Sequence, residues 1–193
     1  LEQAQRNWPP GYTWSIGGES EEMAETFGSA GIALAVAIIM VFGVLVIVFD
    51  SFPQAFILLT TMPMALIGTF LGFFAFGLSL SFFAVVGVIA LIGIVVNNGI
   101  VMVDTMNSRL LEGFTIADVA ARGAADRLRP ILTTSVTTIV GLVPLAIGSP
   151  MYRPLCFAIM FGLVSSTILS LFIIPALYTL LTRKSRAQAE ALD

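Results

Sequence analysis

Two adjacent asparagines, Asn97 and Asn98, are the side chains of this sequence best suited to do chemistry, because they interrupt a long apolar run over residues 82–103. An amide donates and accepts hydrogen bonds but does not titrate. As a helix the run would rise about 33 Å at roughly 1.5 Å per residue, enough to cross a hydrocarbon core of about 30 Å. A buried amide without a partner costs roughly a few kcal/mol. We therefore expect both amides to face polar groups in a bundle of membrane helices.

Hydroxyl side chains in a later apolar segment are the candidate partners of the two amides. They are Thr133, Thr134, Ser135, Thr137 and Thr138. Two plainer interpretations stay open from the residues alone. The amides can act simply as helix-to-helix contacts, typically worth about 1 kcal/mol. The hydroxyls can bond to carbonyls of their own helix, which would leave at most one or two of them with a role.

The composition is that of a membrane protein, with 58% hydrophobic and only 11% charged residues, against about 25% charged in soluble domains. We expect lipid around the chain and no nucleic acid among its partners. The absence of His and the single Cys156 argue against a disulfide framework, a metal cluster or a cofactor. No Asp, Glu, Lys, Arg or His lies inside an apolar segment. A proton-driven machine would therefore need its titrating group elsewhere, and we expect the chain, which begins at Leu1, to be part of something longer.

Five apolar segments predict five transmembrane helices. Their approximate bounds are 31–50, 54–76, 82–104, 130–148 and 154–181. Each is long enough, or nearly so, to span a bilayer. Gly68 and Gly72 in the second segment have a spacing that favours close helix contact.

A further helix is expected in the loop between the third and fourth spans. Thr115 and Asp118 have capping-box spacing, and apolar residues recur at helical spacing after them. This pattern predicts an amphipathic interfacial helix over about 115–128. The predicted fold class is an all-α membrane protein with five transmembrane helices, this cytoplasmic interfacial helix and a short N-terminal remnant of a soluble domain, in which residues 11–18 suit a strand.

Basic residues give the orientation. The 104–130 loop holds four arginines and the tail three Lys or Arg residues, whereas the opposite side holds only Arg6 and Arg153. The positive-inside rule places the loop and the C-terminus in the cytoplasm and Asp104 at the cytoplasmic rim. The expected parts of the chain are an outward-facing segment 1–28, the transmembrane bundle 29–182 and a cytoplasmic tail 183–193.

Three strings of this sequence form a familiar set. They are Gly-Ile-Val-Val-Asn-Asn-Gly-Ile-Val-Met-Val-Asp at 93–104, Arg-Leu-Arg-Pro-Ile-Leu-Thr-Thr-Ser at 127–135 and Gly-Leu-Val-Pro-Leu-Ala at 141–146. Together they resemble the C-terminal end of the resistance-nodulation-division (RND) superfamily, and within it the efflux permeases of the hydrophobe/amphiphile branch. The resemblance covers essentially the whole chain. Residues 1–28 resemble the end of the second periplasmic porter region, and the five spans resemble the last five of twelve.

The resemblance implies a transporter and not an enzyme. Such permeases are homotrimers of the bacterial inner membrane that export drugs or other amphiphiles in exchange for protons, together with a periplasmic adaptor and an outer-membrane channel. Their N-terminal half carries two titrating Asp residues. This chain would supply the non-titrating side of the proton relay, through Asn97, Asn98, Arg127 and Thr134.

Asn97 departs from the pattern of well-known drug pumps, which have a Lys at this position. An amide exchanges hydrogen bonds with a carboxylate but brings no charge, so the pKa of the acids would be less depressed than opposite a cation. Two alternatives stay open: a metal-exporting or lipid-exporting branch of the same superfamily, and a non-transporting scaffold or sterol-sensing-like bundle. An Asp pair in an apolar span upstream would favour the pump.

Overall fold

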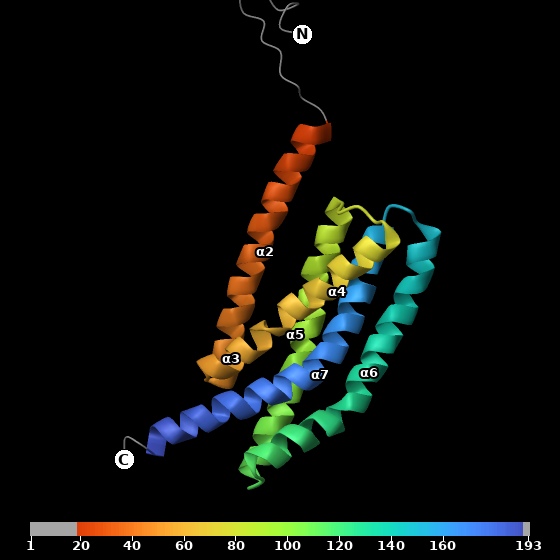
Figure 1. Cartoon of the computed structure of the whole chain (residues 1–193). Coiled ribbons are helices and arrows are strands. Elements are labelled where there is room, and N and C mark those ends of the chain that lie inside the picture. The colour runs from red at the N-terminus through yellow and green to blue at the C-terminus, as the bar shows by residue number, and fades with distance from the viewer. Residues whose placement is uncertain (1–18, 191–193) are drawn as a thin grey trace, which may run out of the picture.

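The computed structural model describes residues 19–190, which are helical apart from short links and contain no strand (Figure 1). The helices are α2 (Glu19–Phe49), α3 (Phe52–Leu59), α4 (Thr61–Phe76), α5 (Phe82–Leu111), α6 (Ile116–Gly148) and α7 (Arg153–Glu190). The strand expected over residues 11–18 lies outside the described residues.

Five helical stretches are long and apolar enough to cross a membrane, which confirms the predicted all-α class and its five spans. They are Phe27–Phe49, Phe52–Phe76, Phe82–Leu111, Ile116–Gly148 and Arg153–Thr182. The chain is therefore a multi-pass membrane protein. Its helices extend further than the apolar runs alone predict, because a helix continues into the polar residues at the membrane surface.

The second span is interrupted at Thr60, between α3 and α4. Pro63 has no N–H to donate to the carbonyl of Leu59, so the hydrogen-bond ladder is broken there. The proline is tolerated because it lies in the first turn of α4. The sequence predicted one continuous segment over 54–76.

The predicted interfacial helix and the fourth span are one helix, α6, and not two elements. Pro130, which we expected to begin the span, lies inside it. An interior proline removes one ladder bond and bends a helix without necessarily ending it. Figure 1 shows α6 bending between its oblique green part and its upright teal part. The Thr115 hydroxyl caps the helix by accepting from the Asp118 N–H, as the capping-box spacing predicted.

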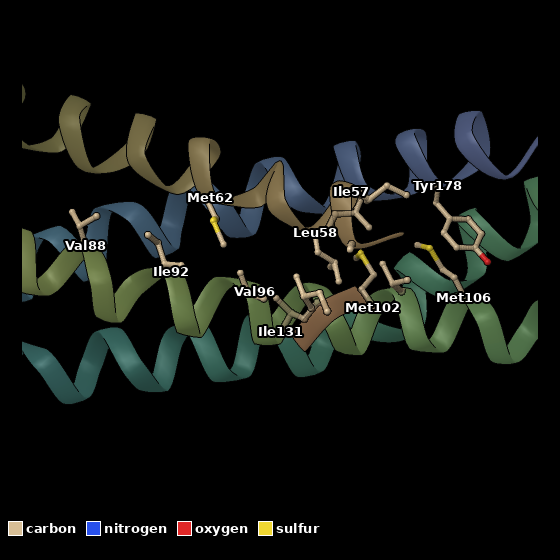
Figure 2. Close-up of a cluster of buried hydrophobic side chains, with 14 of the residues drawn as sticks. Ile57, Leu58, Met62, Val88, Ile92, Val96, Met102, Met106, Ile131 and Tyr178 are labelled. Carbon is tan, nitrogen blue, oxygen red and sulfur yellow. The ribbon is translucent and has the colours of Figure 1, made fainter. Parts of the chain in front are cut away.

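Helix α7 is the centre of the bundle and packs against α3, α4, α5 and α6. Helix α2 is peripheral and, among the described helices, contacts only α3 and α5. Figure 1 shows α2 standing apart from the other spans along its upper part. One long face of α5 is buried, and Figure 2 shows residues from Val88 to Met106 on that face.

Close packing of α4 on α7 depends on glycine, as the spacing of Gly68 and Gly72 predicted. A Cβ added at Gly68 would lie 2.1 Å from the Ser165 Cβ and 2.6 Å from the Phe161 carbonyl oxygen. A Cβ added at Gly72 would lie 2.2 Å from the Phe161 ring. Two hydrogen bonds run between the same helices, from the Thr69 hydroxyl to the Ala158 carbonyl and from the Ser165 hydroxyl to the Met64 carbonyl, both at 3.0 Å.

Candidate functional site

The two asparagines face different neighbours. Asn97 is exposed and lines a groove of about 240 Å³ between α5 and α2, where its surroundings include Met40, Val44 and Leu45. Asn98 is half-buried and lies about 100° further round α5. Among the described residues neither amide has a hydrogen-bond partner. The expectation that Thr133, Thr134, Ser135, Thr137 and Thr138 satisfy them is therefore wrong, whereas contacts of the amides with helices outside this chain stay a prediction.

Most of the candidate hydroxyls donate to carbonyls of their own helix, as the plainer interpretation of the hydroxyls predicted. The acceptors for Thr133, Thr134, Thr137 and Thr138 are backbone carbonyls of α6 at 2.8–2.9 Å. Ser135 is the exception among them. Its hydroxyl lies 2.8 Å from that of Thr167, and this buried pair joins α6 to α7. Helices in lipid commonly use such back-bonds to satisfy hydroxyls that have no other partner.

Arg127 joins α6 to α5. Its Nε donates to the Thr105 hydroxyl at 2.5 Å, and that hydroxyl donates in turn to the Val101 carbonyl at 2.8 Å. The two helices are antiparallel neighbours, connected by the short link 112–115 (Figure 1). The contact therefore places Thr105 and Arg127 at the same level of the two helices.

Asn98 and Thr134 lie on the two helices that this contact joins. Asn98 lies seven residues before Thr105, which is close to two turns or about 10 Å along α5, so the two residues share a face of that helix. Thr134 lies seven residues after Arg127, beyond Pro130 and the bend of α6, so it does not keep the face of Arg127 in the same way. Thr134 is exposed and Asn98 half-buried, and no hydrogen bond joins them. Asn98 thus lies on the α5 face that Arg127 contacts, whereas Asn97 is turned toward α2 and Thr134 bonds within its own helix.

Asp104 is exposed, and among the described residues it forms no ion pair. The ion pair of this region instead joins Arg109 to Asp126 across the α5–α6 turn. The guanidinium groups of Arg109 and Arg122 lie 5.8 and 5.3 Å from the centre of the Phe114 ring. Cations over an aromatic face are attracted to it, so these contacts close the hairpin between the two helices.

A second polar cluster was not predicted from the sequence. Gln54 of α3 and Asn107 of α5 exchange two amide hydrogen bonds, at 3.1 and 2.9 Å. The hydroxyl of the fully buried Tyr178 of α7 donates to the same Asn107 oxygen at 2.8 Å. Gln54 and Asn107 lie 53 positions apart in the sequence, and Asn107 and Tyr178 lie 71 positions apart. The one signal available was that Gln54 and Asn107 are uncharged polar residues at the ends of apolar segments.

Comparison with known proteins identifies the family. The AcrB/AcrD/AcrF family profile matches residues 1–182. The chain is 36% identical to the swarming motility protein SwrC of Bacillus subtilis over 91% of its length, and 36% identical to the cobalt-zinc-cadmium resistance protein CzcA of Cupriavidus metallidurans over 94%. It is 33% identical to the multidrug resistance protein MdtC of Salmonella paratyphi C over 91%.

The fold agrees with a solved relative. The crystal structure of a heavy metal efflux pump superposes on 94% of the chain with a TM-score of 0.79 and 27% identity. The chain spans 18% of that protein and 17–18% of the three curated relatives. The match confirms the resemblance of the three strings to the RND superfamily. This chain belongs to the AcrB/AcrD/AcrF family of RND permeases.

Proposed function

We propose that this chain is the C-terminal transmembrane part of a proton-driven RND efflux transporter, and that α5 and α6 supply the non-titrating side of its proton relay. The observation that carries the proposal is the Asn98 amide, which lies on the same face of α5 as Thr105, the residue that Arg127 of α6 contacts. Asn98 has no hydrogen-bond partner among the described residues, although it lies inside a span. A polar side chain so placed in a membrane is a functional site by default.

The partner groups in this proposal are the two carboxylates of the N-terminal half of the permease. When an acid is charged, the Asn98 amide and the Arg127 guanidinium favour it by donating hydrogen bonds, and Thr134 can turn its hydroxyl from the Ile131 carbonyl toward the acid. When the acid is protonated these donors lose most of their attraction. The alternation would let proton binding change how the two halves pack.

The assembly follows the family resemblance. We place the permease in the bacterial inner membrane as a homotrimer that works with a periplasmic adaptor and an outer-membrane channel. In this orientation residues 1–28 are periplasmic and form the end of the porter region. The 104–130 loop and the tail 183–193 are cytoplasmic, as the distribution of Arg and Lys predicts.

Two cargo classes fit the relatives. The first is drugs or other amphiphiles, favoured by the branch that the sequence strings resemble and by the similarity to MdtC. The second is divalent metal ions, favoured by the similarity to CzcA and to the heavy metal efflux pump. Among the described residues no group of three His, Cys, Asp or Glu side chains gathers in a metal-binding arrangement.

Transport in proteoliposomes tests the proposal. The full-length permease containing this chain would be reconstituted and supplied with a pH gradient, with a fluorescent amphiphilic dye in one arm and Zn²⁺ or Co²⁺ in the other. We expect gradient-dependent movement of the dye, and movement of the metal alone would select the second cargo class. Transport of either cargo at the same rate without a gradient would contradict proton coupling.

A further inference from the structure

Helix α5 forms hydrogen bonds with other helices on two opposite faces near its C-terminal end. Thr105 accepts a hydrogen bond from Arg127 of α6. Two residues later, Asn107 exchanges amide hydrogen bonds with Gln54 of α3 and accepts a third from Tyr178 of α7. We call Gln54, Asn107 and Tyr178 the amide clamp. Figure 2 shows Tyr178 beside Met106 at one end of the buried cluster.

Helical geometry relates the amide clamp to Asn98. Asn107 lies nine residues after Asn98, which is two and a half turns, so the two side chains leave α5 on opposite faces. Thr105 lies nearly two turns after Asn98 and shares its face. The clamp therefore holds the back of α5, while Arg127 holds the front on which Asn98 lies. The two contacts add polar restraints on opposite faces of α5 to the apolar packing of its buried face.

The two contacts together resist rotation of α5 about its axis. A rotation of about 30° would carry an amide that lies about 5 Å from the axis through roughly 2.5 Å. A displacement of that size breaks a hydrogen bond whose donor and acceptor are about 3 Å apart. The reciprocal pairing of Gln54 with Asn107 is sensitive to such a shift, because both of its bonds require the two amides to be nearly coplanar and in line.

The amide clamp is partly buried and links three helices. Tyr178 is fully buried, and its hydroxyl shares the Asn107 oxygen with Gln54, so the amide group of Asn107 is held by donors from two helices. Its own N–H bonds to the Gln54 oxygen, so both polar atoms of the Asn107 amide have partners. A polar network in a low-dielectric interior rigidifies its surroundings when its members are satisfied.

We propose that Gln54, Asn107 and Tyr178 are positioning residues of the proton relay, which set the rotation of α5 and so hold the Asn98 amide toward its acid. The proposal rests on the proposed function, because it assigns the clamp a role in coupling and not only in folding. In this proposal Asn107, on the opposite face of α5 from Asn98, influences the pH response of efflux without contacting Asn98.

The test is the pH profile of efflux by the full-length permease. Asn107→Leu and Gln54→Leu remove the reciprocal pair, and Tyr178→Phe removes one hydroxyl. Gln54→Asn combined with Asn107→Gln restores the summed length of the two side chains. Ser135→Ala is the matched control, since it removes a buried interhelical hydrogen bond that does not involve α5. Asn98→Ala is measured beside them, and folded protein is quantified by size-exclusion chromatography and thermal melting.

We expect the Leu variants to move the pH midpoint of efflux in the direction that Asn98→Ala moves it, by about half a pH unit or more, and the double swap to return it toward the wild-type value. Ser135→Ala should lower the melting temperature without moving the midpoint. If a Leu variant fails to fold, Tyr178→Phe carries the test, with the same direction of shift. The proposal is overturned if Asn98→Ala moves the midpoint while folded clamp variants keep the wild-type value. If Asn98→Ala itself leaves the midpoint unmoved, the relay role of Asn98 is overturned, and the positioning role falls with it.

Discussion

Arg127 and Thr105 join α6 to α5 through one short hydrogen bond, from Nε to Oγ1 at 2.5 Å. The same hydroxyl donates to the Val101 carbonyl, so both of its hydrogen-bonding roles are used. Asn98 lies nearly two turns before Thr105 on the same face of α5, about 10 Å along the helix from this contact.

Removing the Thr105 hydroxyl should weaken the contact between α5 and α6. Thr105→Val keeps the shape of the side chain but leaves Arg127 without its acceptor. A hydrogen bond to a charged group contributes about 1.5–3 kcal/mol when buried, and we expect about 1 kcal/mol here because the site is only partly buried. Thermal unfolding of the full-length permease measures the loss. Thr133→Val is the control, since its hydroxyl bonds only to the Arg129 carbonyl of its own helix. Equal melting temperatures for the two variants would contradict the account.

The orientation is testable by labelling with a membrane-impermeant thiol reagent. Ser79 and Ser108 are exposed and lie at opposite ends of α5 or just beyond it. In a background carrying Cys156→Ser, we expect Ser79→Cys to react from the periplasmic side and Ser108→Cys only after the membrane is opened. Labelling of both cysteines from the same side would contradict the five-span topology.

The contact between α4 and α7 should not tolerate added volume. A Cβ at Gly68 would lie 2.6 Å from the Phe161 backbone oxygen, which cannot turn away as a side chain can. Overpacking of this kind costs typically 1–3 kcal/mol. We expect Gly68→Ala to lower the melting temperature by several degrees. Gly141→Ala is the matched control, because no atom among the described residues lies within 4 Å of its added Cβ. A Gly68→Ala variant as stable as Gly141→Ala would show that the two helices are not in close contact.

A cation at position 97 should change the pH response. Asn97 lines an apolar groove on the α2 side of α5, and a charge there is costly unless it is paired. A Lys at this position has a long side chain that can reach round the helix toward the carboxylates of the N-terminal half. A nearby cation favours the charged form of an acid, so the acids would release their protons at lower pH. We expect Asn97→Lys to move the pH optimum of efflux downward. Asn97→Gln serves as the uncharged control, and identical pH profiles for the two variants would place position 97 away from the relay.

The spans and their packing motif were predictable, because they depend on local sequence. Apolar length predicted the five membrane crossings, and the spacing of Gly68 and Gly72 predicted close helix contact. Pro130 was misleading, since proline disfavours a helix interior but did not end α6.

The polar contacts were mostly not predictable, for two physical reasons. The amide clamp joins residues far apart in sequence, and nothing in the local pattern around Gln54 or Asn107 indicates which residue the other will meet. Asn97 and Asn98 stand out in the sequence, yet they have no hydrogen-bond partner among the described residues. In the proposed function their partners belong to the N-terminal half of the permease.

Cargo-driven proton flux tests most directly whether α5 and α6 carry the relay. The full-length permease would be reconstituted in vesicles that enclose a pH-sensitive dye, and the rate of acidification or alkalinisation would be measured on adding cargo. A hydrogen bond to a charged acid contributes about 1.5–3 kcal/mol, so its loss in Asn98→Ala should reduce this rate by roughly ten- to a hundredfold, and Thr134→Ala should reduce it several-fold. Thr137→Ala is the control, because Thr137 is exposed and its hydroxyl bonds to carbonyls of α6. We predict wild-type flux for Thr137→Ala. Wild-type flux for Asn98→Ala, or an equal loss in all three variants, would contradict the account.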